Sequence, residues 1–270
     1  IDSLRERHVM TLRTRLGNLG NILDESAEQC DHLVLQSPVV SNSEWRALKH
    51  HLGDKAVEID CSFPASSGPD DMRKSLDRIR SEAEQAVRGG CEHVMLTDRA
   101  ASKDHVPLPM ILATGAVHSH LVRNQLRTFA SLNVASGECL DVHHFAVLIG
   151  VGATTINAYA AEWTIAERLE KGLLNGLKHD QAVANYRKAI EDGLLKIMSK
   201  MGISVIASYR GGYNFEALGL SRALVAEFFP PMSSRISGLG LNGIQSRLMD
   251  LHKTAYLDNL SYLPVGGLFR

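Results

Sequence analysis

Short β-rich runs alternate with helix-periodic segments through most of this chain of 270 residues, and this alternation restricts the fold more than any other feature. Strands separated by helices lie parallel in one sheet, because each helix carries the chain back before the next strand begins. The sequence therefore predicts an α/β domain, either a doubly wound sheet or an incomplete (rudimentary) β/α barrel with mainly parallel strands and crossover helices. Seven strands are predicted, at 33–35, 56–63, 93–97, 109–114, 130–135, 144–150 and 203–207.

Helical periodicity is clearest at 70–88, where apolar residues recur on one helix face. Ser43 is the predicted N-cap of an earlier helix that Gly53 ends. Because no Pro/Ser-rich linker, repeat or low-complexity run breaks the pattern, we expect residues 31–270 to form a single domain. Further helices are expected at 155–171, 180–201, 216–229 and 243–256, and 115–127 also has a helical pattern.

The charges of the chain are nearly balanced, with 29 Lys and Arg against 30 Asp and Glu. This balance argues against nucleic acid as a partner, because such binders neutralise phosphates with a basic surplus. The longest apolar runs, such as 145–149, are far shorter than the ~20 residues that cross a bilayer, and no signal peptide opens the chain. We therefore expect a cytoplasmic protein that binds neither nucleic acid nor a membrane.

The cysteine pattern indicates neither a disulfide framework nor a metal centre. No CxxC pair is present, and no histidine stands at zinc-finger spacing from a cysteine. We expect small, buried, hydrophobic side chains in a reducing compartment. The four residues are Cys30, Cys61, Cys91 and Cys139.

Two glycine-containing turns are candidate anion-binding loops. In the first, Gly150 and Gly152 supply two glycines of a dinucleotide fingerprint between a predicted strand and a predicted helix, although Thr155 replaces the third. The second loop could form a nest of backbone N–H groups to which an arginine adds charge. The alternatives are a tight structural turn and a loop whose glycines permit positive φ. The second loop contains Arg210, Gly211 and Gly212.

Polar residues at predicted strand ends form a third candidate site. Asp60 and Asp98 each end a predicted strand, and Asn133 and Ser208 hold similar positions. Two carboxylates that meet in one crevice can serve as general acid and base. The alternative is that each aspartate begins a turn or caps the next helix.

Two histidine pairs offer little as a metal site. His118 and His120 would point apart on a helix, and neither they nor His143 and His144 have a carboxylate or cysteine at convincing ligand spacing. We expect hydrogen-bonded structural histidines and no bound metal.

Residues 1–30 form a basic segment with weak periodicity, which we interpret as an interdomain segment that packs on the main body. The alternative is a solvated basic end. The chain also starts with Ile1 and not with Met, so we expect a piece of a larger protein. The basic residues are Arg5, Arg7, Arg13 and Arg15.

Several long strings, in order, resemble one family across essentially the whole chain. They include TRLGNLGNIL at 14–23, SPVVSN at 37–42 and ATGAVH at 113–118. The remaining strings are HFAVLIG at 144–150, GLLKIMSKMGIS at 193–204, SYRGG at 208–212 and FEA at 215–217. Together they resemble the central domain of the glutamate synthase large (α) subunit, and they are closer to the bacterial NADPH type.

The resemblance implies a rudimentary β/α barrel that links a glutamine amidotransferase domain to an FMN-binding synthase domain of the same polypeptide. In the family, hydrolysis of glutamine yields one glutamate and ammonia, and the ammonia passes through a channel to the flavin. There 2-oxoglutarate is aminated and reduced to a second glutamate. The implied cofactors of the parent enzyme are FMN and a 3Fe-4S cluster, with NADPH used by a small partner subunit. Because residue 1 is Ile and closely spaced cysteines are absent, we expect this fragment to be inactive and to bind no cofactor.

The resemblance also implies that the segment 9–15 lies near the channel and the synthase site. The residues expected to face the FMN domain or the tunnel are Met10, Thr11, Arg13 and Arg15. The alternative to the family reading is a self-contained α/β enzyme domain that binds a nucleotide or phosphate at the turn from Gly150 to Thr155.

Overall fold

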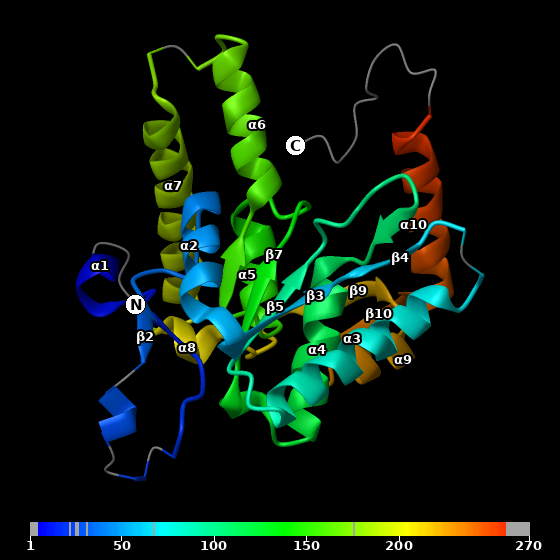
Figure 1. Ribbon diagram of the computed structural model, residues 1–270, viewed down its shortest axis with the longest axis horizontal. Coiled ribbons are helices and arrows are strands. Elements are labelled where there is room, and N and C mark those ends of the chain that lie inside the picture. The colour runs from blue at the N-terminus through cyan, green and yellow to red at the C-terminus, as the bar shows by residue number, and fades with distance from the viewer. Residues whose placement is uncertain are drawn as a thin grey trace.

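Four parallel strands form the central sheet of the computed structural model (Figure 1). They lie in the order β3 (Ala56–Asp60), β5 (His93–Thr97), β7 (Ser131–Ala135) and β8 (Thr155–Asn157). Each strand pairs with the strand that precedes it in this order, so the sheet grows in one direction, as in part of a β/α barrel, and does not reverse as a doubly wound sheet does. This confirms the predicted incomplete barrel. The structure describes residues 5–21, 23–24, 27–30, 32–66, 68–174 and 176–257.

Three crossover helices connect these strands and contribute to the main core. They are α3 (Asp71–Arg88), α4 (Met110–Arg123) and α5 (Val142–Gly150). Leu96 and Val134 of the sheet belong to the same buried cluster as Leu76 of α3 and Ala116 of α4. The apolar stripe predicted at 70–88 is therefore the face by which α3 packs on the sheet.

The opposite face of the sheet is partly polar and is covered by α2 (Asn42–Leu52), whose Trp45 packs with Met95. Along this face, Ser131 Oγ lies 2.9 Å from His93 Nδ1, and the Asn133 amide donates to the same hydroxyl. Thr155 Oγ1 in turn donates to Asn133 Oδ1 at 2.7 Å. These buried polar groups form hydrogen bonds with one another, so this face of the sheet can be both polar and buried without unpaired groups.

The N-terminal segment packs on this body. Thr11 donates its N–H to the Ser204 carbonyl and accepts the N–H of Ile206 at its own carbonyl. Met10, Leu12 and Leu16 of this segment are buried. Within the predicted range 1–30, residues 1–4, 22 and 25–26 lie outside the described residues. The elements here are α1 (Glu6–Val9), β1 (Thr14–Leu16), η1 (Ala27–Cys30) and β2 (Leu33–Leu35), with β1 and β2 antiparallel.

The second half of the chain is mainly helical. Two helices, α6 (Tyr159–Glu170) and α7 (His179–Lys200), run side by side and project beyond the sheet at the top of Figure 1. No helix among the described residues is long and apolar enough to cross a membrane. The other elements are η2 (Gly53–Lys55), β4 (Ser62–Pro64), β6 (His105–Pro107), η3 (Arg127–Phe129), α8 (Ile206–Tyr209), β9 (Glu216–Leu220), α9 (Arg222–Phe228), β10 (Ser233–Leu239) and α10 (Leu241–Ala255).

Several sequence predictions of element type are wrong. The predicted strands 109–114 and 144–150 are in helices α4 and α5, because helices buried on most sides lack the polar periodicity that distinguishes them from strands. The predicted strand 203–207 forms only one bridge, between Val205 and Thr11, before α8. The predicted helices 155–171 and 216–229 each begin with a strand, β8 and β9.

The N-cap of α2 is Ser41 and not the predicted Ser43. Ser41 Oγ accepts the N–H of Glu44, and the Glu44 carboxylate accepts the N–H of Ser41 at 2.8 Å. Both bonds satisfy N–H groups that the helix leaves unpaired.

We expect Ser41→Ala to lower the free energy of unfolding by about 1 kcal/mol, because α2 loses its capping hydroxyl. Ser43→Ala, two residues along, is the matched control and should change it by less than about 0.5 kcal/mol. Urea unfolding of both variants measures the difference. Equal effects of the two substitutions would contradict the assignment of the cap.

Candidate functional site

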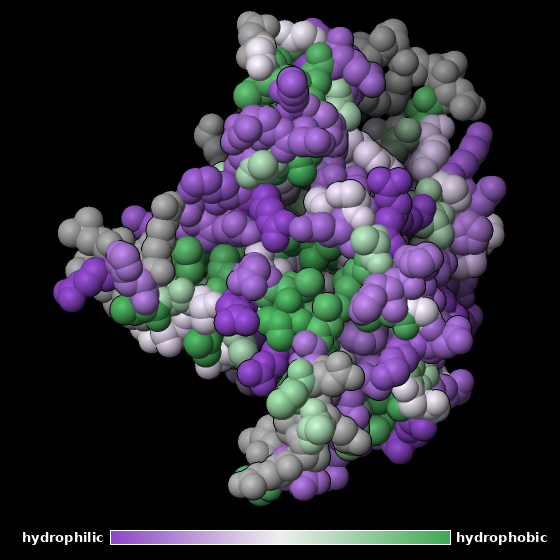
Figure 2. All heavy atoms as spheres, turned by 60° about the vertical axis from the view of Figure 1, so that its left-hand side comes forward, coloured by the Kyte–Doolittle hydropathy of each residue, from purple (hydrophilic) through white to green (hydrophobic). Residues whose placement is uncertain are grey.

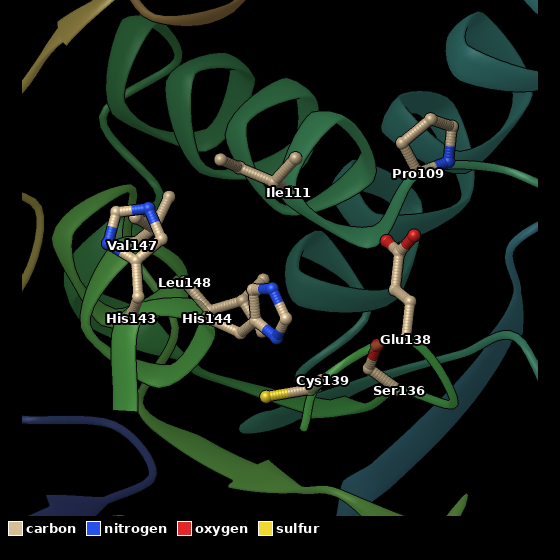
Figure 3. Close-up of a pocket in the computed structure, with 9 residues that line it drawn as sticks. All are labelled: Pro109, Ile111, Ser136, Glu138, Cys139, His143, His144, Val147 and Leu148. Atoms are coloured by element: carbon tan, nitrogen blue, oxygen red, sulfur yellow. The ribbon is translucent and has the colours of Figure 1, made fainter. Parts of the chain in front are cut away.

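A pocket of about 340 Å³ lies beyond the carboxyl end of β7, between the N-terminal ends of α4 and α5 (Figure 3). Open α/β sheets bind ligands in crevices outside the carboxyl ends of their strands. The residues that line it are Pro109, Ile111, Ser136, Glu138, Cys139, His143, His144, Val147 and Leu148.

Glu138 brings a carboxylate to one side of this pocket, beside Pro109 (Figure 3). Its Oε1 accepts the N–H of Met110, the first residue of α4. A helix N-terminus favours a negative charge, since its first N–H groups have no partner within the helix. The contact therefore caps α4 and holds the carboxylate at the pocket.

His144 is oriented by the start of α5. Its Nδ1 accepts a hydrogen bond from the backbone N–H of Leu140 at 3.1 Å and a longer one, at 3.4 Å, from the backbone N–H of Asp141. A ring nitrogen that accepts a hydrogen bond carries no proton, so this geometry assigns the proton of the neutral ring to Nε2. Figure 3 shows the His144 ring near the centre of the pocket, across from Glu138.

Ser136 and Cys139 complete the polar lining. Ser136 is fully buried, and its Oγ has no hydrogen-bond partner among the described residues. Burial, and then the charges of Glu138, Asp141 and Asp98, raise the pKa of the Cys139 thiol. A protonated thiol is a poor nucleophile, so the pocket provides a binding surface and no activated cysteine.

Asp98, one of the two predicted carboxylates, lies behind this pocket and is fully engaged. It accepts the Tyr159 hydroxyl at 2.7 Å and the N–H of Gly137 at 2.9 Å, and burial raises its pKa. Arg99 lies over the Tyr159 ring, 4.0 Å from its centre. These contacts tie β5 to β7 and α6, which gives Asp98 a structural role.

Of the other three residues predicted at strand ends, only Asp60 ends a strand in the structure. Asp60 does end β3, and its Oδ2 accepts the Ser62 hydroxyl at 2.7 Å. Asn133 lies in the middle of β7, and Ser208 lies in α8, so both of those placements are wrong. The aspartates thus reach one edge of the sheet, as expected, and each accepts a hydrogen bond from a neighbouring group. Asp60 Oδ1 is buried and has no hydrogen-bond partner among the described residues.

The two candidate anion-binding loops lie against each other. Gly150 is the last residue of α5, and Gly152 precedes β8, so this is a helix-to-strand turn, opposite to the predicted order. The N–H groups of Gly211 and Tyr213 donate to the carbonyls of Ile149 and Gly150. The N–H groups of Gly152 and Gly212 also donate to chain carbonyls. Anion binding there stays a prediction, and these four amides are already used.

Half-buried cationic groups surround these loops. Arg127 donates to His118 Nδ1 at 3.0 Å and to the Gly152 carbonyl at 2.9 Å. Burial, and then the charges of Arg127 and Arg210, lower the pKa of His118 to about 3. His118 is therefore a neutral structural acceptor, and Arg210 itself contacts the Thr14 hydroxyl at 3.3 Å.

The remaining predicted site residues divide into buried and exposed groups. Met10 is only 8% exposed and packs in the main core, whereas Arg13 and Arg15 are exposed. Thr11 forms the bridge to Val205. Of the cysteines, Cys61 and Cys139 are buried as expected, Cys91 is half-buried and Cys30 is exposed, so the expected burial of Cys30 is wrong.

The sequence reasoning did not single out the Ser136, Glu138 and Cys139 loop. The available signal was its position, since SGEC at 136–139 directly follows the predicted strand 130–135. Glu138 is held at the pocket by its hydrogen bond with the N–H of Met110, the first residue of α4. Because α4 was predicted as a strand, this bond could not be predicted.

The fold and the pocket define a parallel β/α domain with a partly polar crevice beyond the carboxyl end of β7. The model of one family, described as the glutamate synthase central domain, matches residues 1–221. The chain belongs to this family, which confirms the resemblance found in the sequence. The match ends between β9 and α9.

Three curated relatives show the extent of the similarity. The glutamate synthase [NADPH] large chain of Azospirillum brasilense is 62% identical over 100% of this chain and 18% of its own length. The corresponding large chain of Bacillus subtilis is 38% identical, over 97% of this chain and 17% of its own. Ferredoxin-dependent glutamate synthase 2 of Synechocystis is 38% identical, over 95% of this chain and 17% of its own. The chain thus spans less than a fifth of the length of these relatives.

Proposed function

We propose that this chain is the connecting domain of a cytoplasmic glutamate synthase large chain. In this role it links a glutamine amidotransferase domain to an FMN-binding synthase domain and supports the passage of ammonia between them. Membership of the central-domain family carries the proposal. The parent reaction converts glutamine and 2-oxoglutarate to two glutamates. The 62% identity to an NADPH enzyme favours NADPH, delivered through a small subunit, although NADH and ferredoxin forms also occur among the relatives.

The described residues do not fit the cofactors of the parent enzyme. A 3Fe-4S cluster needs several thiolates together, but burial raises the pKa of both Cys61 and Cys139, and no group of three or more metal-binding side chains occurs in the described part of the chain. The glycine-loop amides that could hold a flavin phosphate donate to carbonyls instead. We therefore assign FMN and the cluster to other parts of the parent.

The alternative, a nucleotide-binding enzyme domain at the turn from Gly150 to Thr155, has no supporting observation. That turn runs from a helix into a strand, so no helix N-terminus follows it to receive a phosphate.

Exposed apolar groups support an interdomain role. Trp163 of α6 is 58% exposed, and Leu173, in the connection between α6 and α7, is 60% exposed. A second cavity, of about 270 Å³, lies between β2, α2 and α7 and includes Val34 and Leu48 in its lining. Figure 2, which brings this side of the molecule forward, shows apolar side chains gathered in a hollow of a mainly hydrophilic face. Exposed apolar patches rimmed by polar residues are typical of contacts with other proteins or with other domains of the same chain.

The test is the coupling of the two reactions in the full-length large chain. We expect the double substitution Arg13→Gln, Arg15→Gln to raise the ratio of glutamine hydrolysed to glutamate formed from 2-oxoglutarate at least twofold, because both side chains are exposed on the segment expected near the channel. Met10 is a poorer probe, since its side chain is buried and a substitution would disturb packing.

Arg247→Gln is the matched control, because it removes an exposed arginine from α10, outside both the segment 9–15 and the helix pair α6 and α7. It should keep the wild-type ratio. A wild-type ratio in the double variant would contradict the role of the segment, and the family membership would be unaffected.

A further inference from the structure

The pocket beyond β7 contains a polar group that the described part of the chain leaves unsatisfied. Ser136 is 0% exposed, and its Oγ has no partner among the described residues. Figure 3 shows this oxygen directed into the pocket on the side of Glu138. Buried hydroxyls are nearly always hydrogen-bonded, so an unpaired one that lines a cavity indicates a missing partner.

The pocket presents a carboxyl group, that of Glu138, whose pKa burial raises. A cation beside this group would favour its charged form. The nine lining residues include Glu138 and no Lys or Arg. The charged groups that act on the thiol of the neighbouring Cys139 are Glu138, Asp141 and Asp98, all of them carboxylates. Since one oxygen of Glu138 binds the N–H of Met110, the other remains for a ligand. A second anion would be repelled here, whereas a cation would be attracted.

The opposite wall is apolar. Ile111 of α4 and Val147 and Leu148 of α5 line it. Figure 3 shows Val147 and Leu148 on the far side of the His144 ring from Glu138, and Ile111 above the ring. A ligand that suits both sides has a charged end and a short hydrocarbon stem. A bare inorganic cation would leave the apolar wall without a contact.

We propose that this pocket binds a primary ammonium group on a short aliphatic stem. The Glu138 carboxylate and the Ser136 hydroxyl accept hydrogen bonds from the ammonium, and the stem lies on Ile111 and Leu148. This chemistry is supplied either by a free alkylamine or by a lysine side chain from another part of a longer polypeptide. The site is independent of the proposed connecting role.

The test titrates n-butylammonium chloride into the 270-residue chain and follows backbone amides by NMR. We expect saturable shifts at Met110 and Gly137, with a dissociation constant on the order of 1 mM, which is reasonable for so small a ligand. Butyrate, which has the same stem and the opposite charge, should produce none. The absence of saturable shifts with butylammonium, or equal binding of butyrate, would overturn the proposal.

Two substitutions locate the site. Glu138→Gln should weaken binding at least tenfold, and Ser136→Ala at least threefold, while Glu170→Gln, at the exposed end of α6, should leave it unchanged. Ser136→Ala removes a hydroxyl that has no partner, so this variant should fold even where Glu138→Gln loses the cap of α4. Wild-type affinity in folded Ser136→Ala and Glu138→Gln would contradict the assignment.

Carbodiimide labelling of Glu138 in the full-length large chain distinguishes the two sources of the ammonium group. Protection from labelling there, with labelling in the 270-residue chain, indicates a lysine side chain. Labelling in both, with retained butylammonium binding, indicates a free amine. Labelling in both without butylammonium binding to the full-length chain would overturn the proposal.

Discussion

Gly152→Ala should lower the free energy of unfolding by about 3 kcal/mol, a large effect for the addition of one methyl group. Gly152 has φ of +124°, a conformation that residues with a Cβ rarely adopt. A Cβ at this position would lie 2.3 Å from both Cγ and Nδ1 of His118. His118 cannot easily move away, because its Nδ1 accepts a hydrogen bond from Arg127.

Gly172→Ala is the matched control. Gly172 also has a positive φ, of +67°, but a Cβ there would meet nothing within 4 Å. Gly172→Ala should lower the free energy of unfolding by about 1 kcal/mol, because a residue with a Cβ is strained at positive φ. Urea unfolding of both variants separates the backbone strain from the steric clash with His118. Equal losses of unfolding free energy in the two variants would contradict the close approach of His118 to the Gly152 turn.

The glycine pattern illustrates why local sequence misleads about function. Gly150 and Gly152 match a phosphate-binding fingerprint, but in the structure they make room for other side chains. A Cβ at Gly150 would lie 2.2 Å from the ring of Phe215, a residue 65 positions later in the chain. A glycine lets either a phosphate group or a side-chain ring approach the backbone closely. Only the residues that surround the glycine in the folded structure show which of the two it accommodates.

The predictions of element type succeeded where one face of an element is exposed. The helix predicted at 70–88 and the helix predicted at 180–201 match α3 and α7 closely, because their polar faces make the period visible. The predictions failed at α4 and α5, where most residues are buried and both periods fit the sequence. The parallel direction of the sheet strands followed from the alternation itself, since each helix carries the chain back before the next strand begins.

The candidate site was predictable only in part, for a related reason. The position of Asp98 at the carboxyl edge follows from the strand that precedes it, as expected. The pocket itself requires Glu138 to reach the start of α4, which is 28 residues earlier in the chain. Because α4 was predicted as a strand, no sequence pattern indicated that a helix N-terminus would be available there.

Asp98→Ala should lower the free energy of unfolding by about 3 kcal/mol at neutral pH. The Tyr159 hydroxyl and the Gly137 N–H both donate to the Asp98 carboxylate in a buried setting, and the substitution leaves both donors without an acceptor. Tyr159→Phe removes only one donor and should cost about 1 kcal/mol. In a double-mutant cycle the two losses should be clearly less than additive, because the Tyr159 bond is common to both.

The pH dependence gives an independent check on the same carboxyl group. Burial raises the folded-state pKa of Asp98 above its ordinary value of 3.8, so the folded state keeps the proton to a higher pH than the unfolded state does. The contribution of Asp98 to stability is therefore complete below about pH 4 and decreases as pH rises through the folded-state pKa. Asp98→Asn cannot titrate, so the stability of the wild type relative to this variant should decrease between pH 4 and pH 7. Urea unfolding across this range measures the trend, and a relative stability that increases with pH would mean that the Tyr159 and Gly137 bonds outweigh burial.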